Sequence, residues 1–521
     1  MPLRSLVPSF SPALWAVLAF LLLLCSLSND SIDMLESQTW SYARQDTFGG
    51  FLHELRKDAT SESEMPLGKF SFWAWSRAFG THELAMRSLN LLWAAVALAA
   101  LARAGGRLSI PWLPLLFAVQ PFVWYYMNYA KTPMMQMAGG AILVAGTIGY
   151  VRKGGQSRLD GILLCLGTVL LSVTSMFGLI PLVAVAIGLS AHGFWRRLRL
   201  SLSGKIVFFS TVAIFAALAS YYAAILLHGA GGKPLWTVTP LNVFFAAYEF
   251  LGFQGLGPGR HGLRAMIKGF VSARELLPYI PGLLMLAASY LLVLATACKS
   301  WLTRNYPAVA EKPLSDEAGA EKPFPARWQG YSLLPLWLMG LGVPSLSGCL
   351  LFLIASLATI PFWGHHLAGA FPFWVLALAI TIHWARQGIW RKAGRFAAWG
   401  ILVLLLTSSV IIRFAPFHRH DDYRGAVAEA LRVSASGRTV WWVADYSGGT
   451  YYGLPLAESI TGAPGEIQFA MNRQESPQAL PGAIILSRPD NFDALQAASR
   501  LISSGGYTKV RELQAFEVWE R

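Results

Sequence analysis

Residues 11–40 read SPALWAVLAFLLLLCSLSNDSIDMLESQTW, and they join an apolar run to a group of carboxylates. The run predicts a helix over residues 12–28, which has a length within the roughly 17–25 residues that a membrane span needs. Asp30, Asp33 and Glu36 follow it directly. Charged groups beside hydrocarbon are costly, so a cluster of them at a membrane boundary indicates either a topology marker or a functional site.

The composition of the whole chain is typical of a membrane protein that crosses the bilayer several times. Of its 521 residues, 55% are hydrophobic and only 13% are charged, and the mean hydropathy is +0.46. Apolar stretches recur along the sequence at the length of a membrane span. They predict an α-helical polytopic membrane protein with about eleven transmembrane helices, near residues 12–28, 84–102, 109–126, 133–151, 160–177, 179–195, 206–227, 279–298, 332–357, 368–385 and 397–414.

The net charge of +14 is explained by topology. Lysine and arginine are concentrated in short loops between the apolar segments, at residues 103–107, 152–158, 196–205, 299–327 and 386–395. With Arg4 inside, alternation of the predicted helices places all these loops in the cytoplasm and the two large polar insertions, about 28–83 and 228–278, outside. The sequence has no motif of basic and aromatic residues typical of a nucleic-acid-binding groove, so no nucleic-acid partner is predicted.

The character of the sequence changes after the last apolar segment. Residues 422–433 predict a helix, residues 439–445 and 483–489 predict strands, and residues 491–506 predict another helix. These elements predict a small α/β domain over residues 415–521, outside the membrane. The remaining residues, 1–414, are predicted to form a transmembrane domain that includes the first outside loop, 28–83.

The first outside loop carries the most specific motif, which reads SESEMPLGKFSFWAWSRAFGTHELAMRSLNLLW over residues 61–93. This loop resembles that of the membrane-embedded GT-C glycosyltransferases of the protein mannosyltransferase and aminoarabinose transferase type, glycosyltransferase family 39. The matching residues are Pro66, Leu67, Phe72, Trp73, Phe79, Gly80, Glu83, Ala85 and Arg87. Two further stretches are similar to the family more weakly, residues 120–135 (QPFVWYYMNYAKTPMM) and residues 360–374 (IPFWGHHLAGAFPFW).

The resemblance implies a reaction and a catalytic residue. Enzymes of this type transfer a sugar from a polyprenyl-phosphate donor to an acceptor outside the cytoplasmic membrane, with a first-loop aspartate as general base. The loop length places Asp33 first and Asp30 second in that role. Chemistry agrees, because an acceptor hydroxyl needs a carboxylate within hydrogen-bonding reach to take its proton. The alternative for Asp30 is that it caps a helix, which its Ser-Asn-Asp context favours.

Other charged residues are candidates for binding the phosphate of the donor. The resemblance places Lys131 and the pair His365 and His366 in this role. The alternative for Lys131 is that it extends to the membrane interface, and the alternative for the two histidines is that they are solvated and have no role. Arg260 and Arg264 lie in the second outside insertion, against the positive-inside trend. They predict attraction to a phosphate or to anionic headgroups, or else an ordinary solvated amphipathic helix.

Glu62 and Glu64 precede Pro66, where the family often has an acidic residue and a histidine. They are candidates for a second acid or for metal ligands, and the alternative is a polar loop. No cofactor is predicted with certainty, because the first-loop carboxylates could bind a divalent cation together with the donor phosphate or act without one.

Two other functions compete with the transferase. A transporter or flippase would also need many helices and interfacial charges, but no internal repeat is found and the acidic residues are concentrated in one outside loop. A non-catalytic partner of a polysaccharide assembly system is favoured only by the absence of the family's Asp-Glu pair.

The expected partners are a polyprenyl-phosphate-sugar donor, membrane lipid, and a glycan, lipid or protein acceptor. The expected location is the bacterial inner (plasma) membrane, with a cytoplasmic N-terminus.

Overall fold

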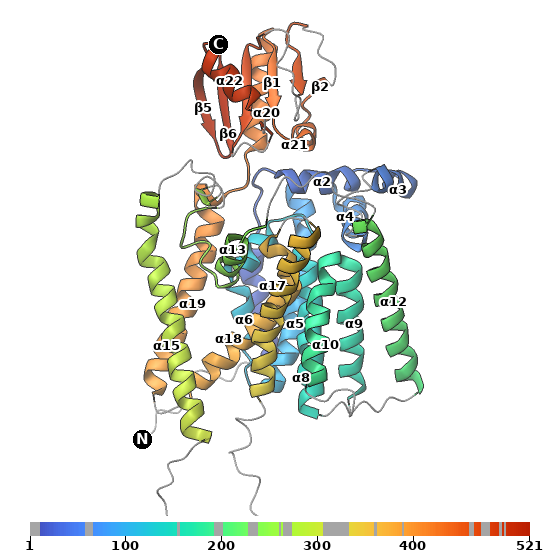
Figure 1. Cartoon of the computed structure of the whole chain (residues 1–521), viewed down its shortest axis with the longest axis vertical. Helices are drawn as coiled ribbons and strands as arrows, with labels where there is room; N and C mark the ends of the chain where they lie inside the picture. Colours follow the sequence, from blue (N-terminus) through green and yellow to red (C-terminus); the bar gives the residue numbers. More distant parts are fainter. Residues whose placement is uncertain are drawn as a thin grey trace, which may run out of the picture.

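The computed structural model describes residues 11–57, 66–153, 157–191, 202–227, 238–259, 262–263, 273–305, 333–358, 362–387, 390–457, 463–469, 480–488, 492–493 and 496–521. Within these ranges, an apolar helical bundle carries short polar helices and a β-sheet unit at one end (Figure 1).

The bundle confirms that the chain is mostly helical and of membrane type. Every segment that the sequence predicts as an apolar helix overlaps a helix of the structure. Among the described residues, six helices are long and apolar enough to cross a membrane by length and composition. The bundle helices are α1 (Pro12–Leu24), α5 (Glu83–Leu108), α6 (Leu113–Ala118), α7 (Pro121–Met127), α8 (Pro133–Lys153), α9 (Arg158–Thr174), α10 (Leu179–Ala191), α12 (Leu202–Leu227), α15 (Ile280–Asn305), α17 (Leu334–Ala358), α18 (Phe371–Ala385) and α19 (Arg391–Phe414).

One predicted helix is wrong in detail, because residues 109–126 form two short helices, α6 and α7, in place of one. Gln120 between them has φ −75° and ψ 129°, an extended conformation. The cause is Pro121, whose ring disfavours the helical conformation of the preceding residue and which has no N–H to donate. The break redirects the chain so that α7 leads into the loop that holds Tyr129 and Lys131.

The helices differ in how deeply they are buried within the bundle. The apolar window of α8 is 94% buried, whereas that of α15 is 22% buried. Peripheral helices expose large apolar side chains, including Leu291 on α15, Leu357 on α17 and Phe396 on α19. In water such exposure would be costly, so we infer that these faces contact lipid.

The buried helix α8 packs closely against η3 (Gly364–Ala370), the short 3₁₀ helix that precedes α18. A Cβ atom on Gly140 would overlap the backbone carbonyl of Gly369, so only glycine allows this approach. The contact fixes the position of His365 and His366, which lie on η3.

The described residues between α1 and α5 form helices that cross one end of the bundle (Figure 1). They are α2 (Met34–Ala43), α3 (Phe48–Lys57) and α4 (Pro66–Phe79). Aromatic side chains join α3 to α4: the ring centroids of Phe48 and Trp73 are 5.6 Å apart, and those of Phe51 and Trp73 are also 5.6 Å apart.

Residues beyond α19 form a β-sheet with flanking helices, named here the α/β unit. Its elements are α20 (Tyr423–Ala435), β1 (Val440–Val443), α21 (Tyr446–Tyr451), β2 (Leu456–Ala457), β3 (Ile467–Phe469), β4 (Ala483–Ser487), α22 (Ala497–Ser504), β5 (Thr508–Leu513) and β6 (Phe516–Glu520). The strand order is β2-β3-β1-β4-β6-β5, with β2, β3, β1 and β4 parallel and β6 antiparallel to both its neighbours.

Helices cover both faces of this sheet, which explains why β1 reads VWWV without a polar residue. Val440 and Trp442 belong to the apolar cluster on the α20 side. Trp441 and Val443 belong to the cluster on the α22 side. Alternate side chains of one strand therefore enter two separate cores.

Five short elements complete the described chain: η1 (Met176–Gly178), α13 (Pro240–Phe250), η2 (Ala273–Tyr279), η3 and η4 (Pro416–His418).

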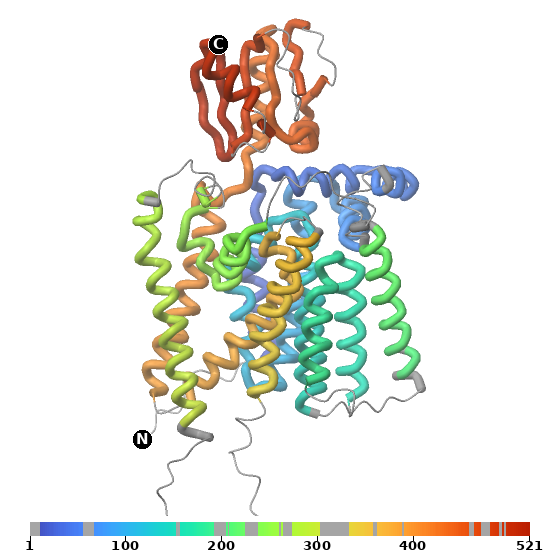
Figure 2. Tube along the Cα trace, viewed as in Figure 1, coloured from blue at the N-terminus to red at the C-terminus, as the bar shows by residue number. Residues whose placement is uncertain are grey.

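Helix α5 runs from the sheet end of the bundle to the opposite end (Figure 2). There, Arg107 and Arg103 form ion pairs with Asp160 at the start of α9, at 2.5 and 3.3 Å. Arg103 and Arg107, which the sequence analysis placed in a loop, therefore lie in the last turns of α5, at the end remote from the sheet.

Candidate active site

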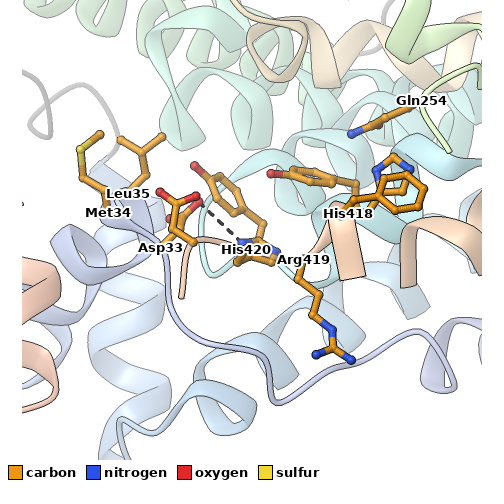
Figure 3. A pocket seen from close by; sticks show the side chains of 11 residues that line it. Asp33, Met34, Leu35, Gln254, His418, Arg419 and His420 are labelled. Carbon is orange, nitrogen blue, oxygen red and sulfur yellow. Dashed lines mark ion pairs between the residues drawn. The ribbon is translucent and has the colours of Figure 1, made fainter. Parts of the chain in front are cut away.

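Asp33 lies in a solvent-open pocket where the helical bundle meets the α/β unit (Figure 3). The empty volume of this pocket, including its open mouth, is about 600 Å³. Its walls come from the start of α2, the loop around α7, the segment after α13 and the linker between α19 and α20. The lining residues are Asp33, Met34, Leu35, Tyr125, Tyr129, Gln254, Phe417, His418, Arg419, His420 and Asp421.

The two oxygens of the Asp33 carboxylate have different surroundings. Oδ1 accepts a hydrogen bond from the backbone N–H of Glu36 at 2.8 Å, and the Glu36 side chain accepts one from the Asp33 N–H, so Asp33 is the N-cap of α2 in a capping box. Oδ2 lies 3.7 Å from Nδ1 of His420. The cap holds the carboxylate in a fixed orientation at the pocket.

Asp30 does not have the capping role that its local sequence suggested. The helix begins one turn later, so Asp33 provides the cap and Asp30 lies in the extended segment before it. Its carboxylate is 3.9 Å from Arg413 on α19, and its carbonyl oxygen accepts a hydrogen bond from Arg87. Asp30 is not among the residues that line the pocket.

Glu36 is a member of this site that the sequence analysis did not assign. Its side chain and that of Arg87 on α5 are both fully buried, and they form two hydrogen bonds, from Nε to Oε1 at 2.9 Å and from Nη2 to Oε2 at 2.7 Å. The N–H of Ala130 donates a further hydrogen bond to Oε1 at 2.8 Å. Such a bidentate pair is strong and geometrically specific.

Arg87 also connects the buried pair to the loop before α2. Its guanidinium donates hydrogen bonds to the carbonyl oxygens of Ser28, Asp30 and Ser31, at 3.2, 2.8 and 3.1 Å. One side chain thus satisfies three backbone groups of an extended loop, which fixes the path of the chain into Asp33. The spacing Asp-x-x-Glu, typical of a capping box, was the available sequence signal for Glu36.

His420 joins the site from the linker between α19 and α20. Its ring stacks against Tyr125 and Tyr129, at centroid distances of 5.6 and 6.1 Å. The side chain is 6% exposed, and its Nδ1 has no hydrogen-bond partner among the described residues. No local pattern in the sequence indicated that this residue would reach α2.

His418 lines the same pocket but does not belong to the carboxylate group. Burial lowers the pKa of His418 to about 4, so its imidazole is neutral near pH 7. The pocket therefore contains one histidine that faces carboxylates and one that does not.

The predicted phosphate ligands form a second group behind the tyrosines. His366 is buried, stacks on Phe177 at 3.8 Å, and is close enough to Lys131 for their charges to interact. His365 contacts the ring of His366 at 4.3 Å and that of Tyr126 at 6.1 Å. The structure thus brings these three predicted residues together, although none of them lines the Asp33 pocket. Tyr126 also contacts Tyr125 and Tyr129 of that pocket, at 5.1 and 5.9 Å.

The other sequence candidates are not placed. Glu62, Glu64, Arg260 and Arg264 lie outside the described residues.

The α/β unit contacts the loop before α2 through a polar cluster. Arg424 on α20 donates a hydrogen bond to Glu83 Oε1 at 2.7 Å, which raises the pKa of the Arg424 guanidinium. The Tyr452 hydroxyl donates to the same oxygen at 2.8 Å and accepts from the Ile32 N–H at 2.9 Å. Burial raises the pKa of this hydroxyl to about 12, so it stays protonated and able to donate. The cluster connects the sheet unit to the segment that carries Asp33.

We expect Tyr452→Phe to loosen this loop without unfolding the protein. The change removes the acceptor for the buried Ile32 N–H, and an unsatisfied buried group costs about 1–3 kcal/mol. Hydrogen exchange at Ile32 should therefore become roughly 10-fold faster, as measured by mass spectrometry in detergent micelles. Tyr446→Phe, on the half-exposed face of α21, is the matched control. Equal exchange in both variants would show that the Tyr452 contact does not hold the loop.

Among the comparisons with known proteins, only those with solved structures give a match. No family model matches the sequence, and no curated protein matches it. A solved structure of ArnT from Cupriavidus metallidurans bound to undecaprenyl phosphate is similar over 97% of both chains, with 14% identity and a TM-score of 0.41. ArnT from the same organism in the apo state is similar over 97% of both chains, with 14% identity and a TM-score of 0.42.

Proposed function

We propose that the protein transfers a sugar from a polyprenyl-phosphate-linked donor to an acceptor hydroxyl at the Asp33 pocket. One observation carries the proposal: a fixed carboxylate oxygen, Asp33 Oδ2, faces a solvent-open pocket at the end of an apolar bundle. The Glu36–Arg87 pair below it gives Asp33 a rigid support. A positioned carboxylate at such a boundary suits a reaction between a lipid-borne donor and a water-borne acceptor.

The assigned role of Asp33 is to activate the acceptor. The acceptor oxygen attacks the sugar carbon as the bond between sugar and phosphate breaks, and the hydroxyl proton must leave. A carboxylate within hydrogen-bonding reach accepts that proton as general base. Asp33 suits this role better than Asp30, since only Asp33 lines the pocket.

The donor phosphate is assigned to the group of Lys131, His365 and His366. A lysine ammonium ion and imidazole N–H groups are suitable donors to phosphate oxygens. This group is joined to the pocket by the contacting rings of Tyr126, Tyr125 and Tyr129. The arrangement would hold the phosphate on one side of the tyrosines while Asp33 acts on the other.

The site is assigned to the extracytoplasmic face. The support is the charge distribution, because Arg103 and Arg107 in the last turns of α5, and Arg158 at the start of α9, lie at the end of the bundle that is remote from the sheet. On this assignment, residues 415–521 form an extracytoplasmic domain beside the pocket, and the acceptor is a glycan, lipid or protein. The protein would belong to a bacterial inner membrane.

The test is a transfer assay on the purified full-length protein in detergent micelles. The probe is a set of undecaprenyl-phosphate sugars, because undecaprenyl phosphate is the lipid bound in the solved ArnT structure. The donor's sugar should be released from phosphate and joined to an acceptor from a panel of cell-envelope glycans, lipids and peptides. Micelles have no two sides, so a transporter would give no product there. A complete lack of sugar release and transfer across the panel would contradict the proposal.

We expect Lys131→Met to weaken the use of the donor more than the chemical step. A hydrogen bond to a charged group contributes about 1.5–3 kcal/mol, so the KM for the lipid donor should rise roughly 10- to 100-fold while kcat changes less. Lys299→Met is the matched control, because Lys299 stacks on Trp390 at 4.2 Å, away from the site. If both variants keep the wild-type KM, Lys131 does not bind the donor.

A further inference from the structure

Three donor atoms converge on one point of the pocket wall. Nδ1 of His420 is 3.7 Å from Asp33 Oδ2 and 3.6 Å from Glu36 Oε2, and Figure 3 marks the first of these pairs with a dashed line. One ligand atom from each residue lies within 4.8 Å of the other two. Both distances from Nδ1 exceed the 2.7–3.2 Å typical of an N–H···O hydrogen bond. The groups therefore face one another without bonding directly.

The His420 nitrogen gives independent evidence that a ligand belongs at this point. The side chain is 94% buried, and Nδ1 has no hydrogen-bond partner within the described ranges. A buried polar atom without a partner is costly, and native proteins rarely leave one unsatisfied. Stacking on Tyr125 and Tyr129 holds the ring so that Nδ1 faces the two carboxylates.

The spacing and the surroundings fit a metal ion. Two ligands at about 2.1 Å from a tetrahedral ion are about 3.4 Å apart, close to the separations found here. Each carboxylate is oriented by a further contact: Arg87 donates to Glu36, and the Glu36 N–H donates to Asp33 Oδ1. Ligand carboxylates in metal sites are commonly held in this way. Arg87 offsets one of the two negative charges, so the group keeps a net negative charge that attracts a cation.

We propose that Asp33 Oδ2, Glu36 Oε2 and His420 Nδ1 bind one divalent metal ion of the zinc type. Zinc is the ion that this donor set suits best. Two carboxylates and one imidazole form a donor set that suits zinc better than magnesium, which rarely takes nitrogen ligands. The fourth position would face the pocket. The ion would join α2 to the linker before α20, and so fix the sheet unit at the site.

Metal binding itself does not depend on the proposed transferase function, whereas the ion's part in catalysis does. An ion at this position would polarise an acceptor or phosphate oxygen and lower the pKa of a bound hydroxyl. Asp33 would then contribute to activation of the acceptor through the ion that it helps to hold.

The experiment measures zinc on the full-length protein in micelles, with no donor or acceptor present. Protein treated with a chelator is titrated with Zn²⁺ by calorimetry, and the bound metal is counted by mass spectrometry after dialysis. Wild type should bind one zinc ion and gain thermal stability. Loss of a residue that only orients a metal ligand lowers metal affinity roughly 10- to 100-fold. His420→Ala removes a ligand itself and should therefore lower the zinc affinity by more than this.

Controls separate loss of a ligand from loss of structure. His418→Ala removes a neighbouring pocket histidine and should keep wild-type zinc affinity. Asp33→Asn tests a second ligand and keeps the cap of α2, since asparagine also caps helices.

If His420→Ala does not fold, Co²⁺ bound to wild type should show intense visible absorption typical of four-coordination, which Asp33→Asn should lose. Failure of wild type to retain stoichiometric zinc, or full binding by both ligand variants, would overturn the site. Sugar transfer without bound metal would overturn only the catalytic role of the ion.

Discussion

Asp33→Asn is expected to lower sugar transfer by roughly 10²-fold or more, which is the usual contribution of a positioned general base. Asparagine keeps the size of the side chain and can still accept the Glu36 N–H, so α2 should remain capped. The change removes the negative charge and the proton acceptor that face the pocket. Initial rates with a saturating undecaprenyl-phosphate sugar, in micelles, would measure the loss.

Asp30→Asn is the matched control for this result. Asp30 is 3.9 Å from Arg413 and does not line the pocket, so the variant should keep much of its activity. Asp33→Ala should lose activity and also about 1 kcal/mol of stability, because alanine cannot cap α2. A reversed pattern, with Asp30 essential and Asp33 dispensable, would move the catalytic role to Asp30. Near-normal transfer by the double variant would exclude a carboxylate mechanism at this loop.

Arg87→Met is expected to have the largest effect on stability, about 3–5 kcal/mol in the free energy of unfolding. The change leaves the Glu36 carboxylate charged, buried and without its bidentate partner, and such a loss is strongly destabilising. It also removes hydrogen bonds from the carbonyl oxygens of Ser28, Asp30 and Ser31. Denaturant unfolding in micelles, followed by tryptophan fluorescence, would measure the difference.

The matched comparison is Arg432→Met, on the half-exposed face of α20. Arg432 pairs with Glu429 and Glu520, but its side chain is 52% exposed, so its loss should cost no more than about 1 kcal/mol. A second variant, Arg87→Met with Glu36→Met, removes the buried charge together with its partner and should recover part of the lost stability. Equal costs for Arg87→Met and Arg432→Met would show that the buried pair does not stabilise the loop.

Local sequence determined the helical bundle and much of the α/β unit. Apolar runs of spanning length predicted the helices, because the cost of burying a polar residue in hydrocarbon acts on each segment separately. The change in sequence character after Phe414 predicted the α/β unit. Its apolar runs VWWV and AIILS are shorter than the membrane spans and are flanked by turn residues. Pro121 also carries a local signal, and its effect on the preceding residue explains the break between α6 and α7.

The site depended on contacts between distant segments, which only the tertiary structure decided. The sequence drew attention to Asp30, Asp33 and Glu36 together, but it could not show that Glu36 turns inward to Arg87 while Asp33 faces the pocket. His420 reaches α2 only because α19 ends beside it and the sheet unit docks on Glu83. The physical reason is that hydropathy and capping act over a few neighbouring residues, whereas buried ion pairs and ring stacking depend on how whole helices pack.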